Sequence, residues 1–272
     1  MGRRRARLDQ GRFVLEGPAV VAEALTHAPP AGGGTRGAGV VIRELFVDED
    51  LGVDEREALL ELAHRRGVPV RRLASGVVQR IADTLSPRGV LAVADRPSLP
   101  VTEVLARADA RPVVVLVDVA DPGNVGTLVR AVEASGAGGL VAAGSSADPF
   151  GPKAARASAG SVVRVPVADG VDAADALGLL GDAGYRRLGA VARRGADYDE
   201  LDLRARVALV LGNEAHGLDG ALATHLDAWI SIPMDGGIES LNVAVAGAVL
   251  CFESARQRRR HPIGRPVADS TR

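Results

Sequence analysis

Asparagine is rare in this chain, and each copy stands in a short motif whose residues could hold a ligand. The three copies are Asn124 in DPGNVGTLVR, Asn213 in LGNEAHGL and Asn242 in ESLNVAV. The chain has 33 basic residues but only one lysine, and its richness in Ala, Gly and Val suggests a GC-rich coding sequence. Amides that are scarce elsewhere and sit in glycine- or serine-bearing motifs therefore indicate that the three motifs share one site.

The first motif joins an apolar run, a turn and a helix. The apolar run VVVLVDV ends near Asp118 and is followed by DPGN, a sequence typical of turns. Asn124 is placed to cap a helix that contains Arg130. Asn124 and Arg130 would then lie in the same region near the helix N-terminus, and an ordinary strand–turn–helix would show the same pattern. The spacing is not the G-x-G-x-x-G dinucleotide fingerprint, and the sequence contains no GK[ST] phosphate loop.

The second motif, RVALVLGNEAHGL, runs from a β-branched strand into glycines that allow a ligand to approach the backbone closely. A buried carboxylate is costly without a partner, so Glu214 is expected to pair with Arg130. His216 has no Cys, Asp or second His at ligand spacing. We therefore interpret His216 as structural or peripheral and expect no metal site.

The third motif, ISIPMDGGIESLNVAVAGAVL, sets polar residues against an apolar helix. Ser240 is predicted to cap a helix that begins near Leu241, and the free amides of such a terminus suit polar or anionic ligand groups. The helix carries Val, Ala and Leu on almost every face and is expected to be buried all round. Asn242 on its first turn must then find a partner in another motif or in a ligand.

Alternating strands and helices must position these motifs, and they fall into two α/β units. In the first, of about ninety residues, we expect strands at 12–17, 41–47, 68–73 and 89–95 and helices from Pro18, at 54–67 and at 75–85. In the second we expect strands at 113–119, 138–144, 162–167, 185–191, 206–212 and 228–233 and helices at 124–135, 151–159, 171–183 and 241–256. Continuous apolar runs predict a doubly wound parallel sheet, with its site beyond the carboxyl ends of the strands.

Composition and charge narrow the class of protein. The 272 residues are 47% hydrophobic and 25% charged, as in globular domains. No run approaches the ~18 apolar residues of a membrane helix, and the N-terminus lacks the apolar core of a signal peptide, so we expect a soluble cytoplasmic protein. Arginines crowd both ends of the chain, which suits a polyanion and is also typical of solvated termini.

Taken together, DPGNVGTLVRA, LGNEAHGL and IPMDGGIESLNVAVAGAVL resemble the three motifs of the SpoU family, the TrmH-like branch of the SPOUT superfamily. Its members are S-adenosylmethionine-dependent RNA ribose 2′-O-methyltransferases. GPKAARASAGSVVRVPV is similar to the family's connecting segment, and GRFVLEGPAVVAEAL and SPRGVLAVA resemble an RNA-recognition domain of the kink-turn-binding ribosomal-protein type. The resemblance implies an RNA-binding domain at 1–95, a linker with one short helix at 96–110, a trefoil-knotted methyltransferase domain at 111–260 and a basic tail at 261–272.

The resemblance also implies the cofactor and the site residues. S-adenosylmethionine would be held by Gly212, Ile232, Met234 and Leu241, with Asn213 and Gly217 in the same loops, and Asn124, Arg130, Glu214, Ser240 and Asn242 would form the catalytic centre. Transfer of an activated methyl group demands alignment and removal of the hydroxyl proton. The family assigns the base role to Arg130, although a guanidinium of pKa about 12 or above resists deprotonation. We expect Arg130 to contact the 2′-oxygen or an adjacent phosphate, oriented by Asn124 and Glu214.

The partners follow from the same resemblance. It implies a homodimer joined through the knot region and an RNA substrate, with large-subunit ribosomal RNA first and transfer RNA second. Two alternatives stay open. A SPOUT enzyme could act on a base nitrogen, although SLNV after IPM favours the ribose branch. A non-catalytic RNA-binding or ribosome-assembly protein could use the same fold.

Overall fold

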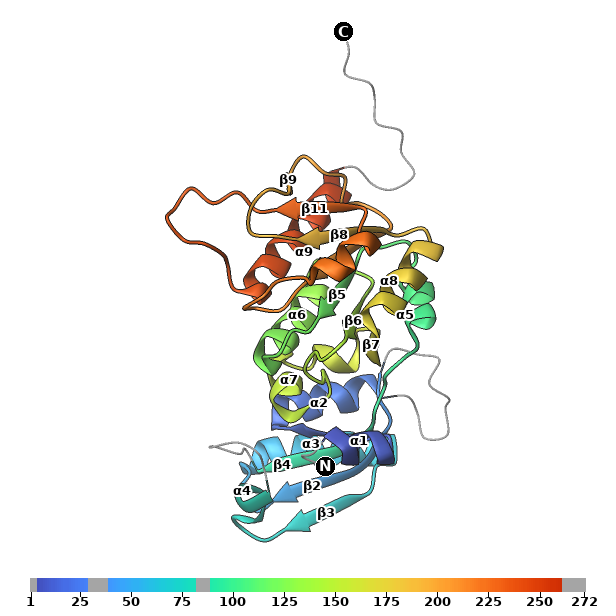
Figure 1. Cartoon of the computed structure of the whole chain (residues 1–272). Helices are drawn as coiled ribbons and strands as arrows, with labels where there is room; N and C mark the ends of the chain where they lie inside the picture. Colours follow the sequence, from blue (N-terminus) through green and yellow to red (C-terminus); the bar gives the residue numbers. More distant parts are fainter. Residues whose placement is uncertain (1–3, 29–38, 82–88, 261–272) are drawn as a thin grey trace.

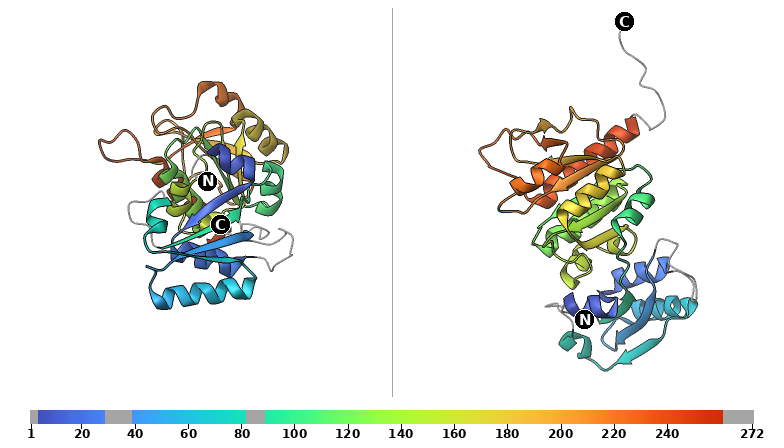
Figure 2. Two further views of the ribbon diagram at one scale, coloured as in Figure 1. Left: turned by 90° about the horizontal axis from the view of Figure 1, so that it is seen from below. Right: turned by 45° about the vertical axis from the view of Figure 1, so that its right-hand side comes forward.

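The computed structural model of the chain describes residues 4–28, 39–81 and 89–260 (Figure 1). The basic tail expected at 261–272 and the far end of the helix expected at 75–85 lie outside the described residues. Two β-sheets are stacked one above the other in Figure 1 and in the right-hand view of Figure 2, each with its own helices.

The first sheet belongs to the N-terminal α/β unit. Its order within the described residues is β1-β4-β2-β3; β4 is antiparallel to β1 and β2, while β3 runs parallel to β2. The elements are α1 (Arg4–Gln10), β1 (Arg12–Glu16), α2 (Pro18–His27), β2 (Ile42–Asp48), α3 (Val53–Arg66), β3 (Val70–Leu73), α4 (Val77–Ile81) and β4 (Val90–Asp95). Phe13, Leu15 and Leu45 are fully buried in its core. The predicted N-terminal unit is confirmed.

The second sheet has the order β7-β6-β5-β10-β8-β11-β9 within the described residues, and its registered strand pairs are all parallel. Its elements are α5 (Val101–Ala108), β5 (Val113–Val117), α6 (Pro122–Ser135), β6 (Gly139–Ala143), α7 (Pro152–Ala157), β7 (Val167–Val171), α8 (Ala173–Asp182), β8 (Arg186–Ala190), β9 (Ala196–Asp197), β10 (Val207–Leu211), β11 (Ala228–Ser231) and α9 (Val243–Arg260). Short 3-10 helices lie at Ser161–Val163 and Gly220–His225.

Both faces of this sheet are covered, which explains its continuous apolar strands. On β5, Val114 and Leu116 join the hydrophobic cluster beneath α6 and α9. Val113, Val115 and Val117 point to the opposite face and join a second cluster with α5 and α8. Because successive side chains of a strand alternate between faces, a strand buried on both sides must be apolar throughout. The predicted doubly wound parallel sheet is confirmed.

The segment 96–110, expected to be a linker with one short helix, carries α5. That helix buries Val101, Val104 and Leu105 in the second cluster. The Leu99 amide donates to the Val167 carbonyl at 2.8 Å, so the segment is held along the edge strand of the second sheet. It is therefore packed along most of its length.

One predicted strand was wrong, and one helix was not predicted. The strand expected at 162–167 is instead a 3-10 turn over Ser161–Val163, entered through Gly160 at φ 91°, and the true strand begins at Val167. Val162 and Val163 are apolar because they are buried in the first cluster. The sequence also gave no signal for α1, a short helix in the basic N-terminal stretch whose Arg7 is buried.

Helix α9 is amphipathic, contrary to the expectation that it is buried all round. Leu250, Cys251 and Ala255 are buried, but Val245 and Phe252 keep 50% and 48% of their surface exposed. Burial raises the pKa of the Cys251 thiol to about 12, as expected for a packed residue. None of the helices in the described parts of the chain has the length and apolarity required to cross a bilayer.

Candidate active site

The first two motifs meet because their strands are neighbours. β5 and β10 run parallel with Leu116 opposite Leu211, so the loops that follow them leave the same edge of the sheet. Asp118 ends this stretch in a left-handed conformation at φ 57°. Its carbonyl accepts a hydrogen bond of 2.8 Å from Asn213 Nδ2. Asn213 thus ties the second motif to the first.

Glu214 makes the next contacts between these loops. Its carboxylate accepts hydrogen bonds from Asn124 Nδ2 at 2.9 Å and from the backbone amides of Ala120 and Asp121 at 3.2 and 3.3 Å. Burial alone would raise the pKa of Glu214, but the hydrogen bonds from Asn124 and the backbone outweigh it and lower the pKa below the ordinary 4.5. Glu214 is therefore ionised at neutral pH.

Asn242 adds the third motif to this network. Its Nδ2 donates to Asn124 Oδ1 at 3.1 Å, and its Oδ1 accepts from the amides of Ala244 and Val245 at 2.9 and 3.3 Å. The direction of each bond is fixed, because an ionised Glu214 can only accept and so receives the Asn124 amino group. The three motifs form one hydrogen-bonded chain from Glu214 through Asn124 to Asn242.

The helix caps differ from those predicted. Asn242, rather than Ser240, caps α9, which begins at Val243. Asp121, rather than Asn124, caps α6 by accepting the Asn124 amide at 2.9 Å. A hydrogen bond from Lys153 Nζ at 2.8 Å, followed by that from the Asn124 amide, lowers the pKa of Asp121. With Asp121 as the cap, the Asn124 side chain is released to face the site.

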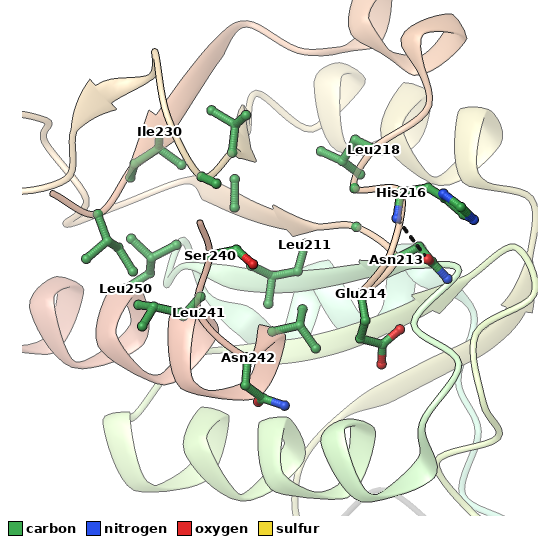
Figure 3. A pocket seen from close by; sticks show the side chains of 18 of the residues that line it. Leu211, Asn213, Glu214, His216, Leu218, Ile230, Ser240, Leu241, Asn242 and Leu250 are labelled. Carbon is green, nitrogen blue, oxygen red and sulfur yellow. Dashed lines mark hydrogen bonds between the residues drawn. The ribbon is translucent and has the colours of Figure 1, made fainter. Parts of the chain in front are cut away.

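A cavity of about 540 Å³ opens beside this network (Figure 3). All six residues expected to hold a cofactor line it, namely Gly212, Asn213, Gly217, Ile232, Met234 and Leu241. Glu214, Ser240 and Asn242 line it as well, and Ser240 is exposed rather than used as a cap. The predicted set apart from Arg130 is thus brought together, with Asn124 attached through its two hydrogen bonds.

One wall of the cavity was not predicted from the sequence. Ala190, Val191 and Ala192, at the end of β8, line it together with Trp229 of β11. Trp229 is the only tryptophan in the chain. The sequence contains few aromatic residues, so Trp229 was the one feature that could have indicated this wall.

Gly212 is required by the close approach of two backbone segments. A Cβ built at this position would lie 2.3 Å from the Gly217 carbonyl carbon and 2.6 Å from the Leu218 amide nitrogen. The bridge between Asn213 and Gly217 closes the same loop, with reciprocal backbone bonds of 2.9 Å. Any side chain at Gly212 would force this cavity wall to move.

Arg130 lies elsewhere. It is exposed on α6 and is absent from the cavity lining, and across the described residues no ion pair joins it to Glu214, so the expected Arg130–Glu214 pairing was wrong. Six helical residues rotate a side chain by about 240°, which turns Arg130 away from the direction of Asn124. His216 lines the cavity, but its ring points away from Ser240 and Asn242 (Figure 3).

Comparison with known proteins identifies this arrangement. Residues 111–252 match the SpoU rRNA Methylase family, and residues 14–100 match the family described as RNA 2′-O ribose methyltransferase substrate binding. The first match covers more than half of the chain and contains all three motifs.

Two curated relatives match part of the chain. An uncharacterized tRNA/rRNA methyltransferase of Mycolicibacterium smegmatis is 43% identical over 104 residues, which is 38% of this chain and 33% of the relative. The 23S rRNA (guanosine-2′-O-)-methyltransferase RlmB of Xanthomonas axonopodis pv. citri is 43% identical over 103 residues, covering 38% of this chain and 41% of the relative. The matches thus span less than half the length of these relatives.

Solved structures extend the similarity to both sheets. An AdoMet-bound rRNA methyltransferase from Sinorhizobium meliloti has a TM-score of 0.79 at 28% identity, covering 96% of this chain and 92% of that one. The SpoU methyltransferase AviRb from Streptomyces viridochromogenes, in complex with AdoMet, has a TM-score of 0.79 at 27% identity and covers 95% of each chain. This chain belongs to the SpoU methylase family.

Proposed function

We propose that the protein is an RNA methyltransferase that uses S-adenosylmethionine to methylate a ribose 2′-hydroxyl. The observation that supports this most strongly is the cavity, because it is lined by the second and third motifs and bordered by the Glu214–Asn124–Asn242 chain. The AdoMet-bound structures named above have the same fold. A SpoU assignment also agrees with the 23S rRNA activity in the name of the Xanthomonas relative.

The cavity fits the proposed cofactor in size and character. Cofactor sites are concave, mostly apolar and about 300–1,000 Å³ in volume, with a few polar groups that fix orientation. Leu211, Ile230 and Leu250 give this cavity an apolar floor for an adenine ring. Gly212 has no side chain, so its backbone packs closely against Gly217 and Leu218 in the wall of the cavity. When bound, S-adenosylmethionine supplies a methyl group activated on a sulfonium.

The side chains beside the cavity would align the ribose. Asn124 and Asn242 hold one another and Glu214 at fixed distances, so their polar atoms form a rigid frame at the cavity edge. Ser240 adds a free hydroxyl on the same edge. A rigid frame lowers the entropic cost of bringing a hydroxyl in line with a methyl donor. In this proposal Glu214 organises the frame as an anion.

Arg130 takes a different role from the one expected of a base. Arg130 is exposed and lies outside the cavity lining of its own protomer. A cation in that place suits the phosphate backbone of a bound RNA. We therefore propose that Arg130 binds a phosphate next to the target ribose.

The N-terminal unit would select the RNA. Residues 14–100 match the substrate-binding family, which supports the proposed division into an RNA-binding domain at 1–95 and a methyltransferase domain at 111–260. RNA is mostly recognised by shape and by exposed loops, which a separate domain can present to the active site. We propose large-subunit ribosomal RNA as the substrate and the cytoplasm as the place of action. Threading of the 232–242 loop in a trefoil knot remains part of the proposal.

The protein would act as a homodimer. Val245, Val249 and Phe252 follow one another at i, i+4 and i+7 on the outer face of α9, where Val245 and Phe252 are half exposed. An apolar helix face in water favours association with a second apolar surface. The same interface would bring Arg130 of α6 near the partner, since α6 and α9 pack side by side (Figure 1).

Mapping of 2′-O-methyl sites in cellular RNA tests this function. We expect one site in 23S rRNA to be methylated in cells that carry the gene and unmethylated in cells that lack it. Complementation with the parent should restore the site, while complementation with Asn242→Ala should not. A difference map without any 2′-O-methyl site would contradict the ribose assignment, and a site in transfer RNA would contradict the ribosomal one.

A further inference from the structure

The N-terminal unit rests on the segment that connects β6 to β7 in the methyltransferase sheet. In Figure 1, α1 and α7 lie between the two sheets. At the centre of the contact, Arg7 of α1 meets Asp148. Arg7 Nε and Nη2 both donate to Asp148 Oδ2, at 2.9 and 2.7 Å. Their side chains keep only 5% and 4% of their surface exposed, so this ion pair is buried between the two units.

A second arginine extends the pair into a cluster. Arg96 donates to Asp169 and lies 3.9 Å from Asp148 Oδ1. Ser98 Oγ donates to Asp169 at 2.5 Å. The cluster therefore holds two cations and two anions, all at least nine-tenths buried at the side chain. Each of these four charges has a partner of opposite sign, as buried charges require.

Aromatic contacts surround this cluster. The Arg96 guanidinium lies over the Phe150 ring, 4.8 Å from its centroid. Phe150 in turn packs edge-on against Phe13 of β1, with ring centroids 5.5 Å apart. Phe13 and Phe150 are both fully buried although they come from different units. The charges thus lie inside a continuous core that joins the units.

Ion pairs at the rim complete the contact. Arg156 donates to Glu16 at 2.9 Å, and Arg164 donates to both Glu23 and Glu133. Glu16 and Glu23 belong to the N-terminal unit, whereas Arg156, Arg164 and Glu133 belong to the second α/β unit. Because rim pairs are partly hydrated, they contribute less to the orientation than the buried pair.

A buried ion pair fixes an orientation in a way that an apolar contact does not. Apolar surfaces can slide over one another at little cost, but moving Arg7 away from Asp148 would break two charge-assisted hydrogen bonds inside a buried contact. Domains joined by ordinary polar interfaces are expected to move relative to one another. Here the charges, the aromatic pair and α1 all resist such movement.

We propose that Arg7 and Asp148 are positioning residues that hold the RNA-binding unit at one orientation to the cavity and so determine which nucleotide reaches it. This inference rests on the proposed function. RNA bound to the N-terminal unit is presented at a fixed distance from the cavity. The distance along the RNA between the bound element and the cavity then determines which ribose is methylated, in addition to any contact with the target base.

Distance measurements between spin labels test the fixed orientation. Labels at Glu57→Cys on α3 and Asp175→Cys on α8 would be placed on exposed residues of different units. The native Cys251 is buried and would not react. With the labelled chain diluted in unlabelled chain, so that distances between the protomers of a dimer do not contribute, we expect one narrow distance distribution by electron double resonance. With Arg7→Met the distribution should at least double in width, whereas Arg5→Met on the same helix, at 93% side-chain exposure, should leave it unchanged.

Methylation kinetics test the consequence. For Arg7→Met we expect kcat to fall at least about tenfold and methylation to spread to neighbouring riboses, because a displacement of about 1 Å is enough for such a loss. Cofactor affinity, read from Trp229 fluorescence, should stay within about twofold of the parent. If Arg7 only stabilised the fold, its replacement would lower cofactor affinity and kcat together. Arg7→Lys keeps the charge and should restore most of the selectivity.

The outcomes separate this inference from the proposed function. A broad distribution in the parent, or an unchanged one in a folded Arg7→Met, would overturn the fixed orientation. A broadened distribution with unchanged kcat and unchanged target would overturn the selection of the nucleotide. If Arg7→Met does not fold, Asp148→Asn, which removes the opposite charge of the same pair, decides by the same two measurements. A parent with a narrow distribution that methylates no RNA would support the fixed orientation and refute the proposed function.

Discussion

Replacing Gly212 with alanine tests the cavity wall most sharply. The new Cβ would lie 2.3 Å from the Gly217 carbonyl carbon, 2.4 Å from its oxygen and 2.6 Å from the Leu218 nitrogen. All three are backbone atoms, so no flexible side chain can turn aside. Since ordinary contacts begin near 3.4 Å, the loop must move by roughly 1 Å.

The size of the effect follows from that movement. Overpacking costs about 1–3 kcal/mol, and a backbone-to-backbone clash falls at the upper end. If binding of the cofactor requires the cavity wall to stay in its present position, this cost of about 3 kcal/mol is taken from the binding free energy. It then corresponds to roughly a 100-fold weaker cofactor affinity. Gly178→Ala on α8 is the matched control, because a Cβ there meets nothing within 4 Å. We expect the control to bind cofactor as the parent does and to be stabilised slightly.

Titration with S-adenosylmethionine measures the affinity through Trp229, which is the only tryptophan and lines the cavity. Circular dichroism confirms that each variant is folded. A folded Gly212→Ala variant with a Kd within about threefold of the parent would refute the assignment of this cavity to the cofactor.

Four further perturbations probe the site and the assembly. Arg130→Ala should reduce methyl transfer at least about 100-fold while cofactor affinity is unchanged, because Arg130 lies outside the cavity; retained turnover would remove it from the reaction. Asn242→Ala should lose about 1 kcal/mol of stability in urea unfolding by removing the α9 cap, and Asn242→Ser should retain that stability. Both Asn242 variants should lose methyl transfer, since alanine has no donor and the shorter serine side chain cannot cap α9 and also reach Asn124; activity in the serine variant would show that the cap alone matters. Phe252→Arg should convert dimers into monomers in size-exclusion chromatography with light scattering, and an unchanged mass would place the interface elsewhere. Folding lowers the pKa of Glu214 below its ordinary value of 4.5. The ionised carboxylate therefore stabilises the folded site at pH values above 4.5, and this stabilisation is lost as the pH falls through the lowered pKa. Cofactor affinity should therefore be constant from about pH 7 to 5 and weaken below about 4.5, with Glu214→Gln free of this step; a step near pH 6 would contradict the bonding pattern.

The parallel sheet and the meeting of the three motifs could both be predicted from the apolar strands that precede the motifs. Five consecutive apolar residues on β5 and on β10 could only belong to strands covered on both faces. Parallel neighbours then bring Asn124 and Glu214 to the same edge. Asn242 was predicted to need a polar partner, and the structure supplies Asn124.

Residue types alone could not decide which polar side chain caps a helix. Ser240 and Asn242 are both good caps, as are Asp121 and Asn124. The choice depends on contacts between distant segments, because Asn124 is engaged by Glu214 and is not available to its own helix. The orientation of Arg130 depends in the same way on where α6 begins, since one residue of shift rotates every side chain by about 100°.

The contact between the two units was least accessible from sequence. Arg7 and Asp148 are 141 residues apart, and Arg7 stands in an arginine-rich stretch where solvated side chains are the usual outcome. Charge composition carries no information about which arginine is buried. The apolar residues Val162 and Val163 likewise imitate a strand but serve the core beneath a 3-10 turn.

Nucleoside mass spectrometry after reaction with methyl-labelled S-adenosylmethionine tests the central claim most directly. Full-length protein and ribosomal RNA from cells lacking the gene are incubated together, and the RNA is digested to nucleosides. The proposed function predicts label in one 2′-O-methylated nucleoside, absent when Asn242→Ala replaces the parent. Label in a base-methylated nucleoside, or no label in RNA although the cofactor binds, would contradict it.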